Sequence, residues 1–189
     1  ELKKARNRIF NFYSKDSTYK IIDNRTAEEG PVTNDMTYQK GAWVLHMLRE
    51  KMGHEAFREG IRSYYQAFYN KNATTDDFFE HMQKFTKATL NGFRNQWLHR
   101  PEVLNLQVSW HYDSASSQLE ITIDQKQSTK FYFEAPIEIE IIETSSKKIV
   151  SLDISSKTST FKIKADKKPV ALLADPRTTL LAKAEIREL

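Results

Sequence analysis

The sequence predicts an α+β fold, in which an all-helical N-terminal part (an antiparallel helix bundle or superhelix) precedes a C-terminal antiparallel β-sandwich. Before Pro101 the apolar residues recur at intervals of three and four, the spacing of one helix face. After Pro101 they alternate with polar residues, the period of strands with one buried face. We therefore expect two domains, a helical one over residues 1–101 and a β-sandwich over residues 102–189.

Composition narrows the class of protein. The chain has 189 residues, 39% of them hydrophobic, and no apolar run approaches the roughly 20 residues that span a bilayer. Its net charge is +4, with Lys and Arg interleaved among Asp and Glu, so neither a membrane nor a nucleic acid is expected as a partner. The absence of cysteine excludes disulfides, thiolate metal sites and cysteine nucleophiles. The sequence does not distinguish a cytosolic from an exported protein.

Helical periodicity and end signals divide the first domain. Gly53 is a typical C-cap residue, and Thr74 with Asp77 matches a capping box. Capping explains the adjacent carboxylates of Asp76 and Asp77 better than paired acid–base catalysis does, since a helix N-terminus favours anions. Short connections favour antiparallel neighbours. We expect helices over about 1–15, 38–52, 54–70, from 75 onward, and 90–99.

The second domain contains six or seven short strands with clean alternation. A turn at 113–117 joins the first two strands into a hairpin, and 180–189 is expected to be a tail that could form a docking helix. Trp110, Tyr112 and Phe131 could form an aromatic binding face, but the alternation favours packing in the core. The expected strands centre on 104–112, 119–123, 137–141, 150–154, 161–163 and 170–173.

The helix beginning near Tyr38 carries the candidate chemistry. Asp35 or Thr37 could cap it, and an apolar stripe is expected to face the core. Gly41 costs a helix about 1 kcal/mol relative to Ala, which suggests that a backbone or a ligand approaches closely. The alternative is a half-buried core Tyr38 with Gly41 at a helix-packing contact. The expected stripe comprises Tyr38, Ala42, Leu45, Leu48 and Met52.

Lys40, in the same turn, has two interpretations. It could neutralise a substrate carboxylate or a helix carbonyl, but a solvated lysine is favoured because lysines are mostly exposed.

The run Tyr38-Gln39-Lys40-Gly41-Ala42, followed by an apolar helix ending in Met47-Leu48-Arg49, resembles the zinc aminopeptidases of the aminopeptidase N type (gluzincins). In that family the tyrosine of this motif lies across the active site from the zinc and donates a hydrogen bond to the oxyanion of the tetrahedral intermediate. Tyr38 is the matching residue and the candidate catalytic residue. Further stretches resemble the family in the same order: 48–53, 73–78, 96–98, 108–113 and 169–176.

The zinc ligands of the family are missing from this chain. The family binds zinc through the H-E-x-x-H motif and a glutamate on the next helix, because residues at i and i+4 face the same way. None of the five histidines is four residues from another. His54-Glu55 begins the pattern, but Arg58 stands at the second histidine position, so His54 is expected to be an exposed helix-start residue. We therefore expect no metal ligand and no cofactor-binding residue here; the histidines are His46, His54, His81, His99 and His111.

The resemblance implies a function for a longer parent protein. That parent would be a zinc-dependent aminopeptidase that hydrolyses N-terminal residues from peptides. This chain would be the C-terminal part of its catalytic domain plus the following β-sandwich, and its partners would be the peptide substrate and the missing N-terminal part. Alone it would be inactive. The alternative is a non-catalytic helical-plus-sandwich interaction module.

Overall fold

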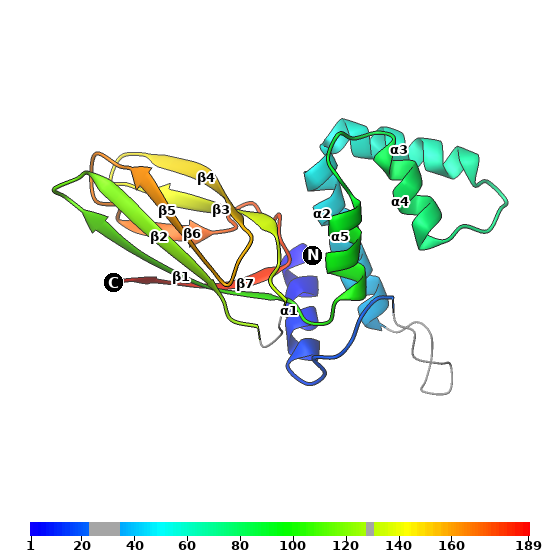
Figure 1. Ribbon diagram of the computed structural model, residues 1–189, viewed down its shortest axis with the longest axis horizontal. Helices are drawn as coiled ribbons and strands as arrows, with labels where there is room; N and C mark the ends of the chain where they lie inside the picture. Colours follow the sequence, from blue (N-terminus) through cyan, green and yellow to red (C-terminus); the bar gives the residue numbers. More distant parts are fainter. Residues whose placement is uncertain (23–34, 128–130) are drawn as a thin grey trace. The chain divides into compact units, whose positions relative to one another are not determined.

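The computed structural model describes residues 1–22, 35–127 and 131–189, which form two compact units, Glu1–Pro101 and Glu102–Leu189. The first unit is helical and the second is built from strands (Figure 1). The predicted fold class, helices followed by a sandwich whose strands are mainly antiparallel, is confirmed.

The helical unit follows the predicted order, with α2 beginning three residues earlier than predicted and α1 and α3 shorter than predicted. Its last predicted helix is an α-helical turn that continues as a π-helical segment, η2. The elements are α1 (Leu2–Tyr13), α2 (Asp35–Met52), α3 (His54–Ala67), α4 (Thr75–Gln83), α5 (Asn91–Arg94) and η2 (Asn95–His99).

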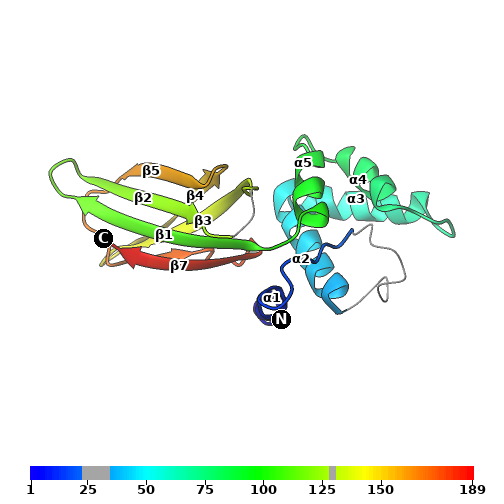
Figure 2. The ribbon, with the colours of Figure 1, turned by 60° about the horizontal axis from the view of Figure 1, so that its bottom comes forward.

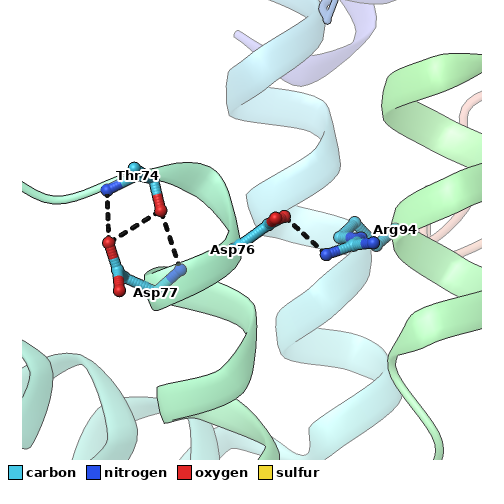
Figure 3. A network of polar contacts seen from close by, with 4 residues as sticks. All are labelled: Thr74, Asp76, Asp77 and Arg94. Carbon is cyan, nitrogen blue, oxygen red and sulfur yellow. Dashed lines mark hydrogen bonds and ion pairs between the residues drawn. The ribbon is translucent and has the colours of Figure 1, made fainter.

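Two predicted end signals are present. Gly53 separates α2 from α3 with a φ of +86°, a conformation that glycine adopts at little cost, and its N–H donates to the Arg49 carbonyl. At the start of α4, the Thr74 hydroxyl accepts from the Asp77 N–H while the Asp77 carboxylate accepts from the Thr74 N–H (Figure 3). Asp76 instead pairs with Arg94 of α5 at 2.6 Å. Capping is thus confirmed for Asp77, whereas the ion pair of Asp76 with Arg94 was not predicted.

The core of the helical unit is formed by large side chains from several helices. Trp43 and Leu48 of α2, Ile9 of α1, Met82 of α4 and Trp97 of η2 are almost completely buried. The helices α3 and α4 approach closely where α3 carries a glycine: a Cβ on Gly60 would lie 2.9 Å from the Met82 thioether.

The described residues of the second unit form seven strands in two sheets. One sheet has the order β5-β2-β1-β7 and the other the order β4-β3-β6, and Figure 2 shows them as two layers. The strands are β1 (Leu104–Asp113), β2 (Gln118–Gln125), β3 (Ala135–Ile142), β4 (Lys147–Ile154), β5 (Thr158–Lys164), β6 (Ala171–Ala174) and β7 (Ala182–Glu188).

The predicted alternation sets the register of the sandwich. In the β1–β2 hairpin Trp110 lies opposite Ile121, and both side chains are buried. Tyr112 is partly buried and donates its hydroxyl to the Ala165 carbonyl. Core packing is thus confirmed for Trp110. It is wrong for Phe131, which precedes β3 and is exposed.

The expected helix in the tail is wrong. Residues 182–188 form β7, which pairs in parallel with β1, Leu104 lying opposite Ala182 and Trp110 opposite Glu188. The segment is rich in helix formers such as Ala and Glu, but pairing with an open sheet edge outweighs such weak local preferences.

Candidate active site

Helix α2 is turned differently from the prediction, and this brings Tyr38 to the surface. The Tyr38 side chain is 72% exposed and Leu45 is 43% exposed, whereas Leu48 and Met52 are buried. The expected stripe is therefore wrong in its first half. Met36, Trp43, Val44 and Met47 occupy the buried face instead.

The size of the side chains explains this orientation. Burying Trp43, Val44 and Met47 removes more apolar surface from water than burying Ala42 and Leu45 would. The Trp43 indole N–H also donates to the Leu2 carbonyl at the start of α1, at 3.3 Å, which fixes the rotation of α2. Residues on the opposite side of α2 consequently face outward.

Gly41 lies on this outward side together with Tyr38. A Cβ built on Gly41 would have no neighbour within 4 Å among the described residues. Tyr38, Gly41, Ala42 and Leu45 are spaced i, i+3, i+4 and i+7, so they form one face of the helix. Within the described part of the chain, the alternative of a half-buried core Tyr38 and a packed Gly41 is wrong.

Lys40 is not solvated, contrary to prediction. Its side chain is 1% exposed, and its Nζ donates a hydrogen bond of 2.8 Å to the Tyr13 Oη of α1. Nζ also lies 5.0 Å from the centre of the Tyr13 ring. Burial disfavours the charged amine and lowers the pKa of Lys40 to about 7. The same burial raises the pKa of the Tyr13 phenol, which stays protonated.

Thr37 precedes Tyr38 and lies within the first turn of α2, which begins at Asp35. Its Oγ1 is 2.8 Å from the Tyr19 Oη. Thr37 is therefore not the cap of this helix, and the residue before Asp35 lies outside the described residues.

Sequence reasoning did not foresee that Tyr13 and Tyr19 contact α2. Tyr13 belongs to the apolar stripe of α1, and nothing in that spacing shows that its hydroxyl meets a lysine 27 positions away. The nearest signal was the unusual placement of Lys40 four residues before Val44 on what proves to be the buried face.

The residues present do not fit a zinc site. Among the described residues no three His, Asp or Glu side chains come together to hold a metal ion. His46 Nδ1 lies 2.9 Å from an Arg49 nitrogen, and His81 Nε2 lies 3.0 Å from the Ser63 hydroxyl. His54 is the exposed first residue of α3, as predicted.

No helix in the described ranges is both long and apolar enough to cross a bilayer.

Comparison with known proteins assigns the helical unit to a family. Residues 6–97 match the model of the Peptidase family M1 domain. The chain is 29% identical to Escherichia coli aminopeptidase N over 118 residues, which is 59% of this chain and 13% of that protein. It is 32% identical to Haemophilus influenzae aminopeptidase N over 88 residues, which is 47% of this chain and 10% of that protein.

A solved structure supports the same architecture. The crystal structure of Legionella pneumophila aminopeptidase A in complex with aspartic acid matches with a TM-score of 0.72 and 13% identity, over 96% of this chain and 23% of that one. At this identity the likeness concerns the fold.

The exposed motif on α2 lies within the stretch that matches this family model. Over residues 6–97 the chain is an aminopeptidase N-like member of peptidase family M1.

Proposed function

We propose that this chain is the C-terminal part of the catalytic domain, together with the following β-sandwich, of a zinc-dependent aminopeptidase. The whole protein would remove N-terminal residues from peptides. Family membership supports the reaction class, and the small share of each relative that the chain covers supports the assignment to a part of a longer enzyme. The zinc would be held by residues outside this chain, whose sequence contains no H-E-x-x-H motif, and the described residues bring no three potential ligands together.

Tyr38 is the residue that we assign to the chemistry. The observation that carries this role is its position: the motif tyrosine points outward with 72% of its side chain exposed, while Lys40, two residues later, is buried. A phenol O–H at such a position can donate a hydrogen bond to the oxyanion of a tetrahedral intermediate. A preorganised donor of this kind contributes about 100- to 1000-fold to the rate.

The test is Tyr38→Phe in the whole protein, assayed on aminoacyl-nitroanilide substrates. The substitution keeps the ring and removes the O–H, so kcat should fall by about 100- to 1000-fold with little change in KM. Tyr65→Phe is the matched control, since Tyr65 is a 66% exposed tyrosine on α3 that has no assigned role. A near-normal kcat for Tyr38→Phe would refute the assignment.

Two further measurements test the rest of the proposal. A metal chelator should abolish activity of the whole protein, and zinc should restore it. The 189-residue chain alone should release no nitroaniline. A whole protein without an H-E-x-x-H motif and without activity would instead favour an interaction module.

A further inference from the structure

Tyr13 and Tyr19 contact residues of α2 that flank Tyr38 in the sequence. Tyr19 Oη and Thr37 Oγ1 are 2.8 Å apart, and Thr37 immediately precedes Tyr38. Lys40, two residues after Tyr38, donates from Nζ to Tyr13 Oη at 2.8 Å. Tyr13 Oη in turn donates to the Tyr19 carbonyl at 2.8 Å, so the two tyrosines are joined.

This network is buried, so it restricts the positions that α2 can take. Tyr13, Tyr19 and Lys40 are each less than a tenth exposed, and the two tyrosine rings pack edge to face with centres 6.2 Å apart. An unsatisfied polar group in such a place costs about 1–3 kcal/mol, so arrangements of α2 that break these bonds are disfavoured.

The Lys40 part of the network acts from the side of the helix opposite the phenol. Successive helical residues are rotated by about 100°, so residues at i and i+2 point in nearly opposite directions. Lys40 accordingly points into the core while Tyr38 points out. The hydrogen bonds at Thr37 and Lys40 hold the first two turns of α2 without covering the Tyr38 side chain, which stays exposed.

We propose that Tyr13, Tyr19 and Lys40 form a positioning network that fixes the first two turns of α2 and thereby the direction of the Tyr38 phenol. The inference rests on the proposed function, in which that phenol meets the oxyanion. These three residues do not touch substrate; they act through Tyr38. Precise placement matters because a displacement of about 1 Å in a catalytic group can cost on the order of 100-fold in rate.

The chemistry of the pair suits this role. Because burial lowers the pKa of Lys40 to about 7, the amine loses its proton near pH 7. In its uncharged form it places no cation in the core. Tyr13 can accept from Lys40 on its oxygen and donate its own proton to the Tyr19 carbonyl, so one hydroxyl serves both bonds.

The test is a double-mutant cycle in the whole protein, with Lys40→Met, Tyr38→Phe and both together. Lys40→Met removes the donor and keeps an apolar stem in the cavity. It should lower kcat by about 10- to 100-fold with KM unchanged, and should have almost no further effect once Tyr38 is Phe. Tyr13→Phe should behave in the same way, and Lys40→Gln, which retains an N–H donor, should recover part of the loss.

The cycle separates positioning from general stability. A residue needed only for folding would lower kcat by the same factor in both backgrounds, and that result would overturn the inference while leaving the role of Tyr38 intact. If Tyr38→Phe alone had normal activity, the proposed function would fail first, and the positioning role would fall with it.

A second measurement uses the 189-residue chain and needs no activity. Amide hydrogen exchange over residues 38–43 should be faster in Lys40→Met than in the unmodified chain, while strand β1 stays unchanged. Lys51→Met is the matched control, because Lys51 is an exposed lysine on the same helix. Unchanged exchange at 38–43 would show that the network does not hold this turn, whatever the kinetic result.

Discussion

The central strand of the sandwich and the central helix of the helical unit use their apolar residues differently. In β1, Leu104, Leu106 and Val108 are all buried between neighbouring strands and the opposite sheet. In α2 one face is buried to the same degree, but the opposite face, with Tyr38 and Leu45, is exposed. Packing within its own unit explains the apolar residues of β1. Such packing does not explain the residues on the outer face of α2, which we assign to function.

The largest difference should appear when the same residue type is truncated in both elements. Leu106→Ala opens a cavity in a fully packed core, and the free energy of unfolding should fall by about 2–5 kcal/mol. Leu45→Ala removes a side chain that is 43% exposed, and the change should stay within about 0.5 kcal/mol. Urea unfolding of the 189-residue chain measures both. A large loss for Leu45→Ala would mean that this face of α2 is packed in solution.

A second, smaller effect should come from Lys40 on the buried face of α2, which should make the free energy of unfolding depend on pH. The folded-state pKa of Lys40, about 7, lies below 10.5, the ordinary value for a lysine, so between these two pH values the unfolded chain binds more protons. The contribution of Lys40 to stability is therefore fully present above pH 10.5 and is lost as the pH falls towards 7. Between roughly pH 7 and 8.5 the free energy of unfolding should rise by about 1–2 kcal/mol more in the unmodified chain than in Lys40→Met.

The control for this measurement is again Lys51→Met, which should keep the pH dependence of the unmodified chain. The upper limit of about pH 8.5 keeps tyrosines in their neutral form, both in the unfolded chain and at Tyr13. If the Lys40→Met variant keeps the same slope as the unmodified chain, the burial of the Lys40 amine is contradicted.

The smallest effect should come from the N-terminal end of α4. Thr74→Ala removes the side-chain oxygen that accepts from the Asp77 N–H, and should cost about 1 kcal/mol. Thr75→Ala, at the next position, is the control and should change stability little. Thermal unfolding of the two variants measures the difference. Equal melting temperatures would show that the capping box is not maintained in solution.

Much of this architecture follows from local patterns. The change of apolar period at Pro101, the capping box at Thr74 and the glycine between α2 and α3 are signals that neighbouring residues carry by themselves. The β1–β2 hairpin is equally local, because its turn and both alternating runs are adjacent in the sequence.

The predictions that were wrong depend on contacts between residues far apart in the sequence. The rotation of α2 depends on α1, since Trp43 and Lys40 bond to Leu2 and Tyr13. No periodicity shows that a lysine will be accommodated in a core by a phenol. The strand β7 was similarly hidden, because its alternation of Ala182, Ala184 and Ile186 with charged residues becomes decisive only beside the open edge of β1.

The parallel pairing of β1 with β7 also affects the order in which the sandwich can assemble. These are the first and last strands of the unit, and Leu104 meets Ala182 only after every intervening strand has been made. A ribosome would release the helices well before this ladder could close, and loops of this length close slowly relative to helix formation. Until then β1 offers an open edge, so nascent chains halted before residue 182 should be the species most prone to aggregation.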